Sequence, residues 1–178
     1  IMRFPECVPK TVIASSAVAV KEFIEAYGSA VVKPLDNMGG RGIMILDNHN
    51  AYKDQLKMIE VLAQSGYFMI QEKVDIFAGG DKRVFIIDGQ VIPYACARFP
   101  AAGSLIANLA QGGSYQVVEL NSRDFDIAES VAKSVVNDGM RVIGLDIVDG
   151  YLTEINVTSP TCMREINERY PIDLSCLF

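Results

Sequence analysis

The sequence places carboxylate and amide side chains at a spacing that suits a divalent cation. Glu154 and Asn156 lie two residues apart in the apolar stretch 152–157. This stretch predicts a β-strand, on which both side chains share one face. Asp146 lies in a preceding apolar stretch, across the turn signal Asp149-Gly150. Hard oxygen ligands of this kind suit Mg²⁺, which completes its coordination with phosphate oxygens and water.

Whether Asp146 joins the other two side chains depends on the register of this hairpin. A two-residue loop places Asp146 opposite Thr153, so the acidic side chains lie on opposite faces. A three-residue loop, 149–151, places Asp146 opposite Glu154 and Asn156 on the same face. Only the three-residue loop also merges the apolar residues of both strands into one buried face. We therefore predict this register, with a solvated polar face of an ordinary hairpin as the alternative to a metal site.

Cationic side chains lie at two other points of the chain. Lys33 ends an apolar stretch just before the glycine-rich loop 37–42. Backbone N–H groups of such a loop can approach a phosphate closely, and a lysine supplies the charge. Arg83 and Arg98 lie on the two strands predicted around Asp88-Gly89, where guanidinium groups could bind a carboxylate or a transferring phosphoryl group. A flexible turn and surface arginines are the alternatives.

The composition excludes several classes of protein. The net charge is −6 and no basic run is present, which argues against nucleic acid as a partner. No stretch of about 18 apolar residues predicts a membrane span. Four cysteines without a CxxC pair and a single histidine, His49, argue against a zinc site and favour reduced thiols in a cytoplasmic protein. Because the first residue is Ile1, we expect a fragment or a processed form.

The predicted elements alternate between helices and strands, which indicates an α+β protein. Residues 1–14 read as a lead-in from a missing N-terminal domain, 15–72 as a small lobe and 73–178 as a large lobe. We expect helices from Ser15 or Ser16 to Tyr27, from 51 to 63 and from 123 to 136. We expect strands at 30–34, 43–46 and 67–71, and hairpins at 81–87/90–95 and 140–148/151–157.

Five blocks of sequence, in this order and spacing, resemble the bacterial glutathione synthetase family. They are Val32–Gly40, Gly80–Val84, Pro93–Arg98, Asn108–Gly113, and Gly144–Asp146 continued by Thr153–Thr161. The resemblance covers nearly the whole chain. It implies an ATP-grasp fold, in which two α+β lobes with antiparallel sheets clasp ATP between them.

The resemblance also implies a reaction, the ATP-dependent formation of a C–N bond. ATP phosphorylates the carboxylate of γ-glutamylcysteine, and the amine of glycine attacks the acyl phosphate to give glutathione, ADP and phosphate. Catalysis of such a reaction rests on positioning and on neutralisation of charge. The implied partners are these small molecules, without nucleic acid or membrane; a homo-oligomer is left open.

Residue roles follow from the same resemblance. Lys33 contacts ATP phosphate, Gly39 and Gly40 belong to a mobile loop over the phosphates, and Asp81 holds the ribose side. Gln71, Glu72, Lys73 and Val74 form a hinge whose backbone binds adenine. Arg83 and Arg98 face the transferring phosphoryl group, and Asp146, Glu154 and Asn156 bind two Mg²⁺ or Mn²⁺ ions. Asn108, Ser159, Pro160 and Thr161 border the peptide substrate.

Two positions depart from the family pattern. Ala17 stands where the family has a lysine that contacts ATP phosphate, and Ile106 stands where it has an arginine that contacts the γ-glutamyl end of the substrate. Two alternatives therefore stay open: a related ATP-grasp ligase acting on a different carboxylate, and a non-catalytic ATP-binding module.

Overall fold

The computed structural model describes residues 1–37, 39–47, 53–101, 107 and 112–177. The chain divides into two compact units, which we describe one at a time. One unit comprises Pro9–Lys73, and the other comprises Ile1–Val8 together with Val74–Phe178. In the described part of the chain, no helix combines the length and the apolar character needed to cross a membrane.

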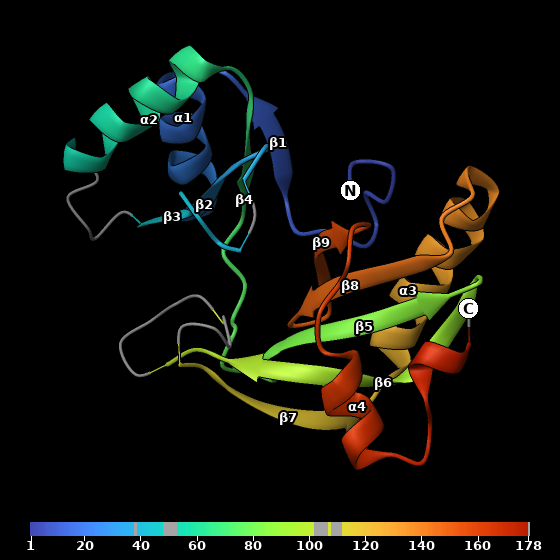
Figure 1. Ribbon diagram of the computed structural model, residues 1–178. Helices are drawn as coiled ribbons and strands as arrows, with labels where there is room; N and C mark the ends of the chain where they lie inside the picture. Colours follow the sequence, from blue (N-terminus) through green and yellow to red (C-terminus); the bar gives the residue numbers. More distant parts are fainter. Residues whose placement is uncertain (38, 48–52, 102–106, 108–111, 178) are drawn as a thin grey trace. The chain divides into compact units, whose positions relative to one another are not determined.

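The unit Pro9–Lys73 is an antiparallel sheet with two helices packed on it (Figure 1). The strand order is β1-β4-β2-β3, and every neighbouring pair is antiparallel. Its core joins apolar residues of the strands to those of both helices, including Phe23, Ile59 and Phe68. The elements are β1 (Thr11–Ala14), α1 (Ala17–Tyr27), β2 (Ser29–Pro34), β3 (Met44–Asp47), α2 (Lys53–Ser65) and β4 (Phe68–Gln71).

Local signals fix the ends of α1. The side chain of Ser16 accepts a hydrogen bond from the Ala19 N–H, so one of the unpaired donors of the first turn is satisfied. Gly28 ends the helix in the left-handed region, where glycine has no Cβ penalty. The predicted boundaries of this helix are confirmed.

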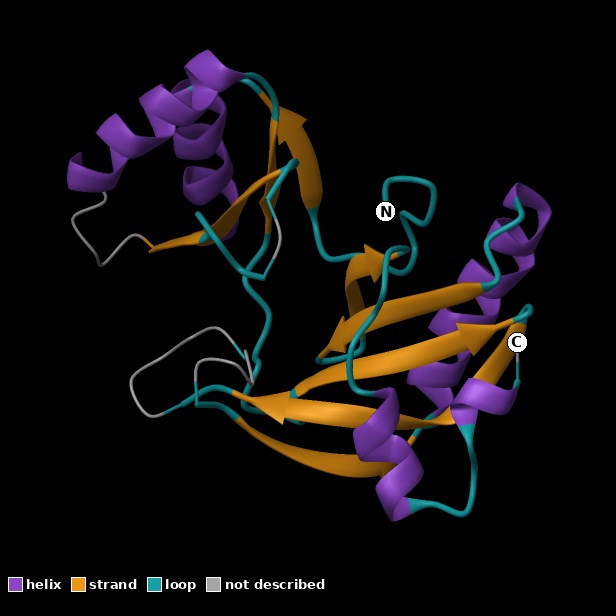
Figure 2. Ribbon diagram, in the orientation of Figure 1, coloured by secondary structure: helices purple, strands orange, loops and turns teal. Residues whose placement is uncertain are grey.

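The second unit contains the sheet β7-β6-β5-β8-β9, which is antiparallel throughout (Figure 2). Helix α3 packs on one face against Val84 and Leu145, and α4 packs on the other face against Phe85 and Cys96. The elements are β5 (Asp81–Ile87), β6 (Gln90–Phe99), β7 (Ser114–Glu119), α3 (Ser122–Val135), β8 (Val142–Val148), β9 (Tyr151–Asn156) and α4 (Met163–Arg169), with 3₁₀ turns at Val136–Asp138 and Leu174–Cys176.

The first fourteen residues take part in both units. Phe4 and Cys7 belong to the core under α3, and the carbonyl of Cys7 accepts a hydrogen bond from the Leu152 N–H at 2.8 Å. Thr11–Ala14 forms the edge strand β1, paired with β4. Two elements that the sequence pattern did not assign, β7 and α4, complete the second unit.

A buried ion pair joins β5 to α3 on the face of the sheet that α3 covers. The Lys82 ammonium lies 2.6 Å from Asp124 Oδ2, and the Asp124 side chain is fully buried. Asp124 also forms a capping box with Asn121, in which each side chain bonds the backbone N–H of the other residue. Its second oxygen, Oδ1, is buried and has no hydrogen-bond partner. The pair therefore depends on a single charged contact to Lys82.

We predict that Asp124→Ala lowers the free energy of unfolding by about 3–5 kcal/mol, because it leaves the Lys82 ammonium without a partner in a largely buried position. Urea unfolding followed by circular dichroism measures the change. Glu129→Ala on the same helix is the control, because Glu129 pairs with the exposed Lys133; its effect stays within about 0.5 kcal/mol. A loss below about 1 kcal/mol for Asp124→Ala would contradict the prediction.

Candidate functional site

The hairpin of β8 and β9 places Asp146 directly opposite Glu154, as predicted. The loop, however, has two residues, Asp149 and Gly150, and not the predicted three. Both have positive φ, 49° and 74°, as a type I′ turn requires. The extra residue that brings Asp146 opposite Glu154 is Thr153, which forms a β-bulge in β9.

The bulge explains why the predicted pairing of Asp146 with Glu154 is right, although the predicted loop and the pairs next to it are wrong. It keeps the favoured two-residue turn and still sets Leu152 opposite Ile147, where Leu152 is fully buried. The Thr153 hydroxyl donates to the Asp146 carbonyl at 3.1 Å, which holds the bulged backbone. Val157, expected in the buried face, is instead 54% exposed beyond the end of β9.

Arg83 and Arg98 lie on the same face of the sheet as Asp146. In the register, Arg83 is opposite Asp146 on β8 and opposite Cys96 on β6. Arg98 lies two residues from Cys96 and opposite Asp81, so its side chain shares that face. Both guanidinium groups therefore reach the carboxylate of Asp146.

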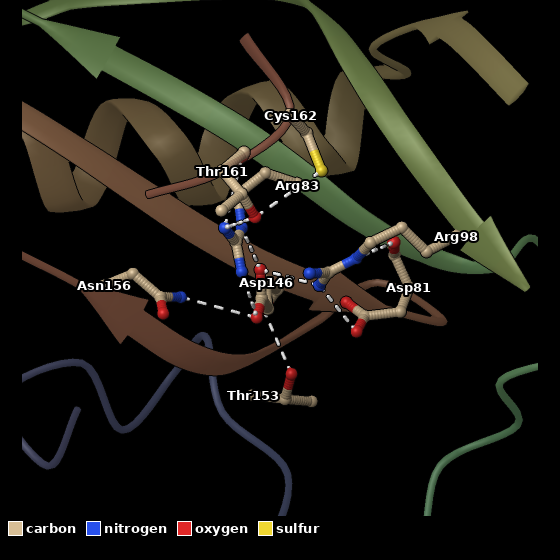
Figure 3. A network of polar contacts seen from close by, with 8 residues as sticks. All are labelled: Asp81, Arg83, Arg98, Asp146, Thr153, Asn156, Thr161 and Cys162. Atoms are coloured by element: carbon tan, nitrogen blue, oxygen red, sulfur yellow. Dashed lines mark hydrogen bonds and ion pairs between the residues drawn. The ribbon is translucent and has the colours of Figure 1, made fainter. Parts of the chain in front are cut away.

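The carboxylate of Asp146 lies between the two guanidinium groups (Figure 3). Arg83 donates from Nε to Oδ1 at 2.6 Å and from Nη2 to Oδ2 at 3.1 Å, a bidentate contact. Arg98 Nη2 lies 3.0 Å from Asp146 Oδ1 and 2.7 Å from Asp81 Oδ2. Asn156 Nδ2 donates to Asp146 Oδ2 at 3.4 Å. Four strands thus meet in one polar cluster.

Burial and charge act in opposite directions on these groups. Burial alone raises the pKa of Asp146, but the charges of Arg98 and Arg83 outweigh it and hold that pKa below its ordinary value. Burial lowers the pKa of each arginine, and the neighbouring carboxylates more than restore it. Asp146 and both arginines are therefore charged in the folded protein.

Asp81 is in a different electrostatic position. Burial and the negative charge of Asp146 raise the pKa of Asp81 to about 7, although Arg98 opposes the shift. Its Oδ2 is paired with Arg98, whereas its Oδ1 is buried without a hydrogen-bond partner. A buried acceptor without a partner is costly, so this oxygen is suited to a donor or cation supplied by a ligand.

The predicted metal ligands lie on one face of the β8–β9 hairpin, and their oxygen atoms are of the type that a hard cation prefers. Asp146 is anionic, Glu154 is exposed directly opposite it, and Asn156 turns its Oδ1 away from Asp146 (Figure 3). The set holds two carboxylates and an amide; in the described part of the chain, no group of three or more His, Cys, Asp or Glu side chains could hold an ion. A cation here therefore needs further oxygens from a ligand or water, as Mg²⁺ commonly does.

The segment 159–161 passes over the sheet next to Arg83. Arg83 Nη1 donates to the Thr161 carbonyl at 3.3 Å and to its Oγ1 at 3.5 Å. Pro160 crosses Gly144 so closely that a Cβ at Gly144 would lie 2.6 Å from Pro160 Cβ and 3.0 Å from Arg83 Cδ. Gly144 is thus a positioning residue that the sequence pattern did not single out.

The other unit carries Lys33, Gln71, Glu72 and Lys73, and we describe it by itself, whereas Val74 is the first residue of the long segment of the second unit. Lys33 Nζ donates to Gln71 Oε1 at 2.6 Å, and Gln71 Nε2 donates to Thr11 Oγ1 at 3.1 Å. The backbone N–H of Glu72 donates a hydrogen bond to the Lys10 carbonyl at 2.9 Å. The Gln71 side chain is buried between Lys33 and β1, while Lys73 is exposed and Val74 half-buried.

The glycine loop connects the antiparallel strands β2 and β3 as a hairpin. Gly39, Gly40 and Gly42 all have positive φ, a conformation that residues with a Cβ rarely adopt. Ala17 is the first residue of α1, directly after the capping Ser16. Asn108 and Ile106, as well as Met38 and His49, lie outside the described residues.

Comparison with solved structures defines the class of fold. The ATP-grasp ligase PsnB, complexed with a minimal precursor, Mg and ADP, superposes with a TM-score of 0.64 at 23% identity, over 94% of this chain and 50% of that one. D-cycloserine synthetase DcsG gives a TM-score of 0.69 at 19% identity, over 86% of this chain and 58% of that one. The fold is therefore ATP-grasp, as the sequence predicted.

Sequence comparison then identifies the family. The prokaryotic glutathione synthetase ATP-grasp domain matches residues 1–171, and the chain belongs to this family. Glutathione synthetase of Vibrio parahaemolyticus is 40% identical over 174 residues, which are 97% of this chain and 54% of the relative. That of Pseudomonas syringae pv. tomato is 40% identical over 177 residues, 98% and 54%. The chain spans about half the length of these curated relatives.

We predict that Gly144→Ala destabilises the second unit by about 1–3 kcal/mol, the cost of overpacking, because the new methyl group overlaps Pro160. Gly79→Ala is the matched control, since a Cβ there would meet only the flexible Lys82 side chain, at 3.7 Å. Neither glycine has a positive φ, so backbone strain does not confuse the comparison. Equal unfolding midpoints for the two variants would disprove the close approach.

Proposed function

We propose that the chain is the nucleotide-binding and catalytic part of an ATP-dependent ligase that joins γ-glutamylcysteine and glycine through an acyl phosphate. The observation that carries the proposal is the buried cluster in which Arg83 and Arg98 share the carboxylate of Asp146. Membership of the prokaryotic glutathione synthetase family and the names of its relatives support the choice of substrates.

The cluster suits the transfer of a phosphoryl group to a carboxylate. A carboxylate is a poor electrophile, and phosphorylation gives it a leaving group. Guanidinium groups held in place before the reaction stabilise the charge that develops on the phosphoryl oxygens. Asp146 holds Arg83 and Arg98 side by side despite their equal charges, so the protein needs little reorganisation when the anionic substrate arrives.

Asp146, Glu154 and Asn156 are the residues we propose for the metal. Two Mg²⁺ ions, or Mn²⁺ in their place, would be held there together with phosphate oxygens, and they would neutralise the charge of the phosphates. Glu154 is exposed opposite Asp146, so its carboxylate can reach a ligand without breaking the bidentate contact of Arg83.

We propose nucleotide contacts for the following residues, each described within its own unit. Lys33, Gly39 and Gly40 bind phosphate, and the backbone of Gln71 to Val74 binds adenine. The Glu72 N–H already bonds Lys10, so adenine uses other backbone groups of this hinge. Asp81 binds the ribose side through Oδ1, the buried oxygen that has no partner in the described structure.

The substrate side is proposed for Ser159, Pro160 and Thr161, with Asn108. Thr161 contacts Arg83, which connects this segment to the reacting centre. Two other functions stay open. Ile106 favours a ligase acting on a different carboxylate, and Ala17 favours an ATP-binding module without turnover. The substrates in each case are small molecules, and we propose a cytoplasmic location.

Release of ADP by the full-length protein tests the proposed reaction. We expect ADP formation that requires both γ-glutamylcysteine and glycine, together with Mg²⁺, and a product with the mass of glutathione. Other γ-glutamyl and dipeptidyl acids serve as the comparison set. Turnover only with another acid would support the different-carboxylate ligase, and ATP binding without turnover on any acid would support the non-catalytic module.

Asp146→Asn tests the carboxylate that the arginine cluster and the proposed metal ligands have in common. Removing the charge leaves two adjacent guanidinium groups without the anion that holds them, so we expect ADP formation to fall by roughly 100-fold or more. Asp149→Asn makes the same chemical change on the same hairpin, and asparagine tolerates the positive φ of that position. We expect it to retain activity within about twofold. Circular dichroism separates a loss of catalysis from a loss of folding, and full activity in folded Asp146→Asn would refute the role of the cluster.

A further inference from the structure

Two cysteines lie beside the arginine cluster, and no role proposed above uses them. Cys96 is in β6 directly opposite Arg83, and it is fully buried. Cys162 immediately precedes α4 and is 6% exposed. Both belong to the apolar cluster under α4, together with Phe85 and Ile166. Segments 66 residues apart in the sequence thus bring two thiols to one place.

The two thiols lie in one buried apolar cluster and influence each other's pKa, and one of them also contacts the site. Cys162 Sγ lies 3.8 Å from Thr161 Oγ1, which in turn accepts from Arg83 (Figure 3). Cys162 is therefore connected to Arg83 through the Thr161 side chain.

The surroundings shift the pKa values of the two thiols in opposite directions. The neighbouring Cys96 thiol lowers the pKa of Cys162, burial opposes it, and the Arg98 charge, the Thr161 hydroxyl and the Arg83 charge add to the lowering, to about 7. The neighbouring Cys162 and burial raise the pKa of Cys96. A thiolate is the reactive form of cysteine, and a neighbouring thiol can resolve its oxidised product.

We propose that Cys96 and Cys162 form a reversible disulfide in response to hydroperoxides, and that this bond switches off the adjacent site by drawing Thr161 away from Arg83. The disulfide is an inference from the two cysteines alone. Its effect on catalysis rests on the proposed ligase function.

The chemistry balances with hydrogen peroxide as the oxidant. The Cys162 thiolate attacks one peroxide oxygen and the O–O bond breaks, so that Cys162 becomes a sulfenic acid and hydroxide leaves and takes up a proton to form water. The Cys96 thiol then attacks the sulfenic sulfur, the S–O bond breaks, and a second water leaves with the Cys96 proton. Two thiols and one peroxide thus give one disulfide and two waters. A dithiol reverses the step by thiol–disulfide exchange.

Geometry explains why the bond would disturb the site. The two sulfurs must come to about 2.05 Å from each other to form a disulfide. Cys96 is fixed in the middle of β6, paired with strands on both sides. Cys162 lies in the segment after β9, where Ser159 and Cys162 both have positive φ, 46° and 86°. The segment with Thr161 is thus the part that moves.

The test uses the chain with Cys176→Ser, which removes the exposed thiol and leaves three buried ones. The protein is treated with hydrogen peroxide, alkylated in denaturant and digested without reduction, and the peptides are identified by mass. We expect a crosslinked Cys96–Cys162 peptide pair, two of the three thiols lost, and full recovery with dithiothreitol. Cys162→Ser and Cys96→Ser abolish the crosslink, whereas Cys7→Ser retains it, because Cys7 lies in the core under α3. Absence of the crosslink, or a crosslink that involves Cys7, overturns the proposal.

The regulatory effect is tested on the full-length protein. We expect the crosslinked form to turn over roughly tenfold to a hundredfold more slowly than the reduced form, the scale of a displacement of about 1 Å in a catalytic site. Dithiothreitol restores the rate, and Cys96→Ser loses this reversible inhibition. Unchanged turnover in the crosslinked protein overturns the switch. Failure of the proposed ligase function is separate, since it appears as no turnover in the reduced protein while the crosslink still forms.

Discussion

The contact on which the second unit depends is the sharing of one buried carboxylate, Asp146, by two guanidinium groups. Removing these charges from water is costly, and the cost is offset only when the geometry is close and the remaining oxygens are bonded. Arg83 meets that requirement with a bidentate contact, and Asp81 and Asn156 complete the cluster. Because these residues come from β5, β6, β8 and β9, the cluster is satisfied in only one register of the sheet.

Side chains of β5 alternate between the two faces of the sheet, so the face covered by α3 also carries a buried ion pair. Lys82 points to the α3 side between two residues, Asp81 and Arg83, that point to the site. One strand therefore carries a buried ion pair on each face, with apolar residues beyond them, from Val84 to Ile87. A shift by one residue would exchange the charged and apolar positions on both faces, so polar and apolar constraints select the same register.

Much of this arrangement could be predicted from the sequence, because it follows from period-two alternation and turn chemistry. Asp88-Gly89 and Asp149-Gly150 are strong hairpin signals, and the apolar face alone placed Asp146 opposite Glu154. The bulge at Thr153 could not be predicted, because alternation does not distinguish an extra loop residue from an extra strand residue. Strand β7 is a largely exposed edge without a clear apolar face, and α4 has only seven residues, about two turns, which is too short a window to distinguish a helical pattern in the sequence. The contact of Gly144 with Pro160 depends on a segment that returns over the sheet, which no local pattern encodes.

The two arginines also connect the catalytic proposal with the thiol proposal. Their field favours any anion placed next to them, whether the Asp146 carboxylate, a transferring phosphoryl group or the Cys162 thiolate. These anions compete for the same positive charge. We expect an anionic ligand bound at Arg83 and Arg98 to raise the pKa of Cys162, which would lower its thiolate fraction at neutral pH and slow its oxidation. An occupied site would in this way be less sensitive to peroxide than an empty one, and the same electrostatic arrangement that would hold the substrate would also decide when the proposed thiol pair can react.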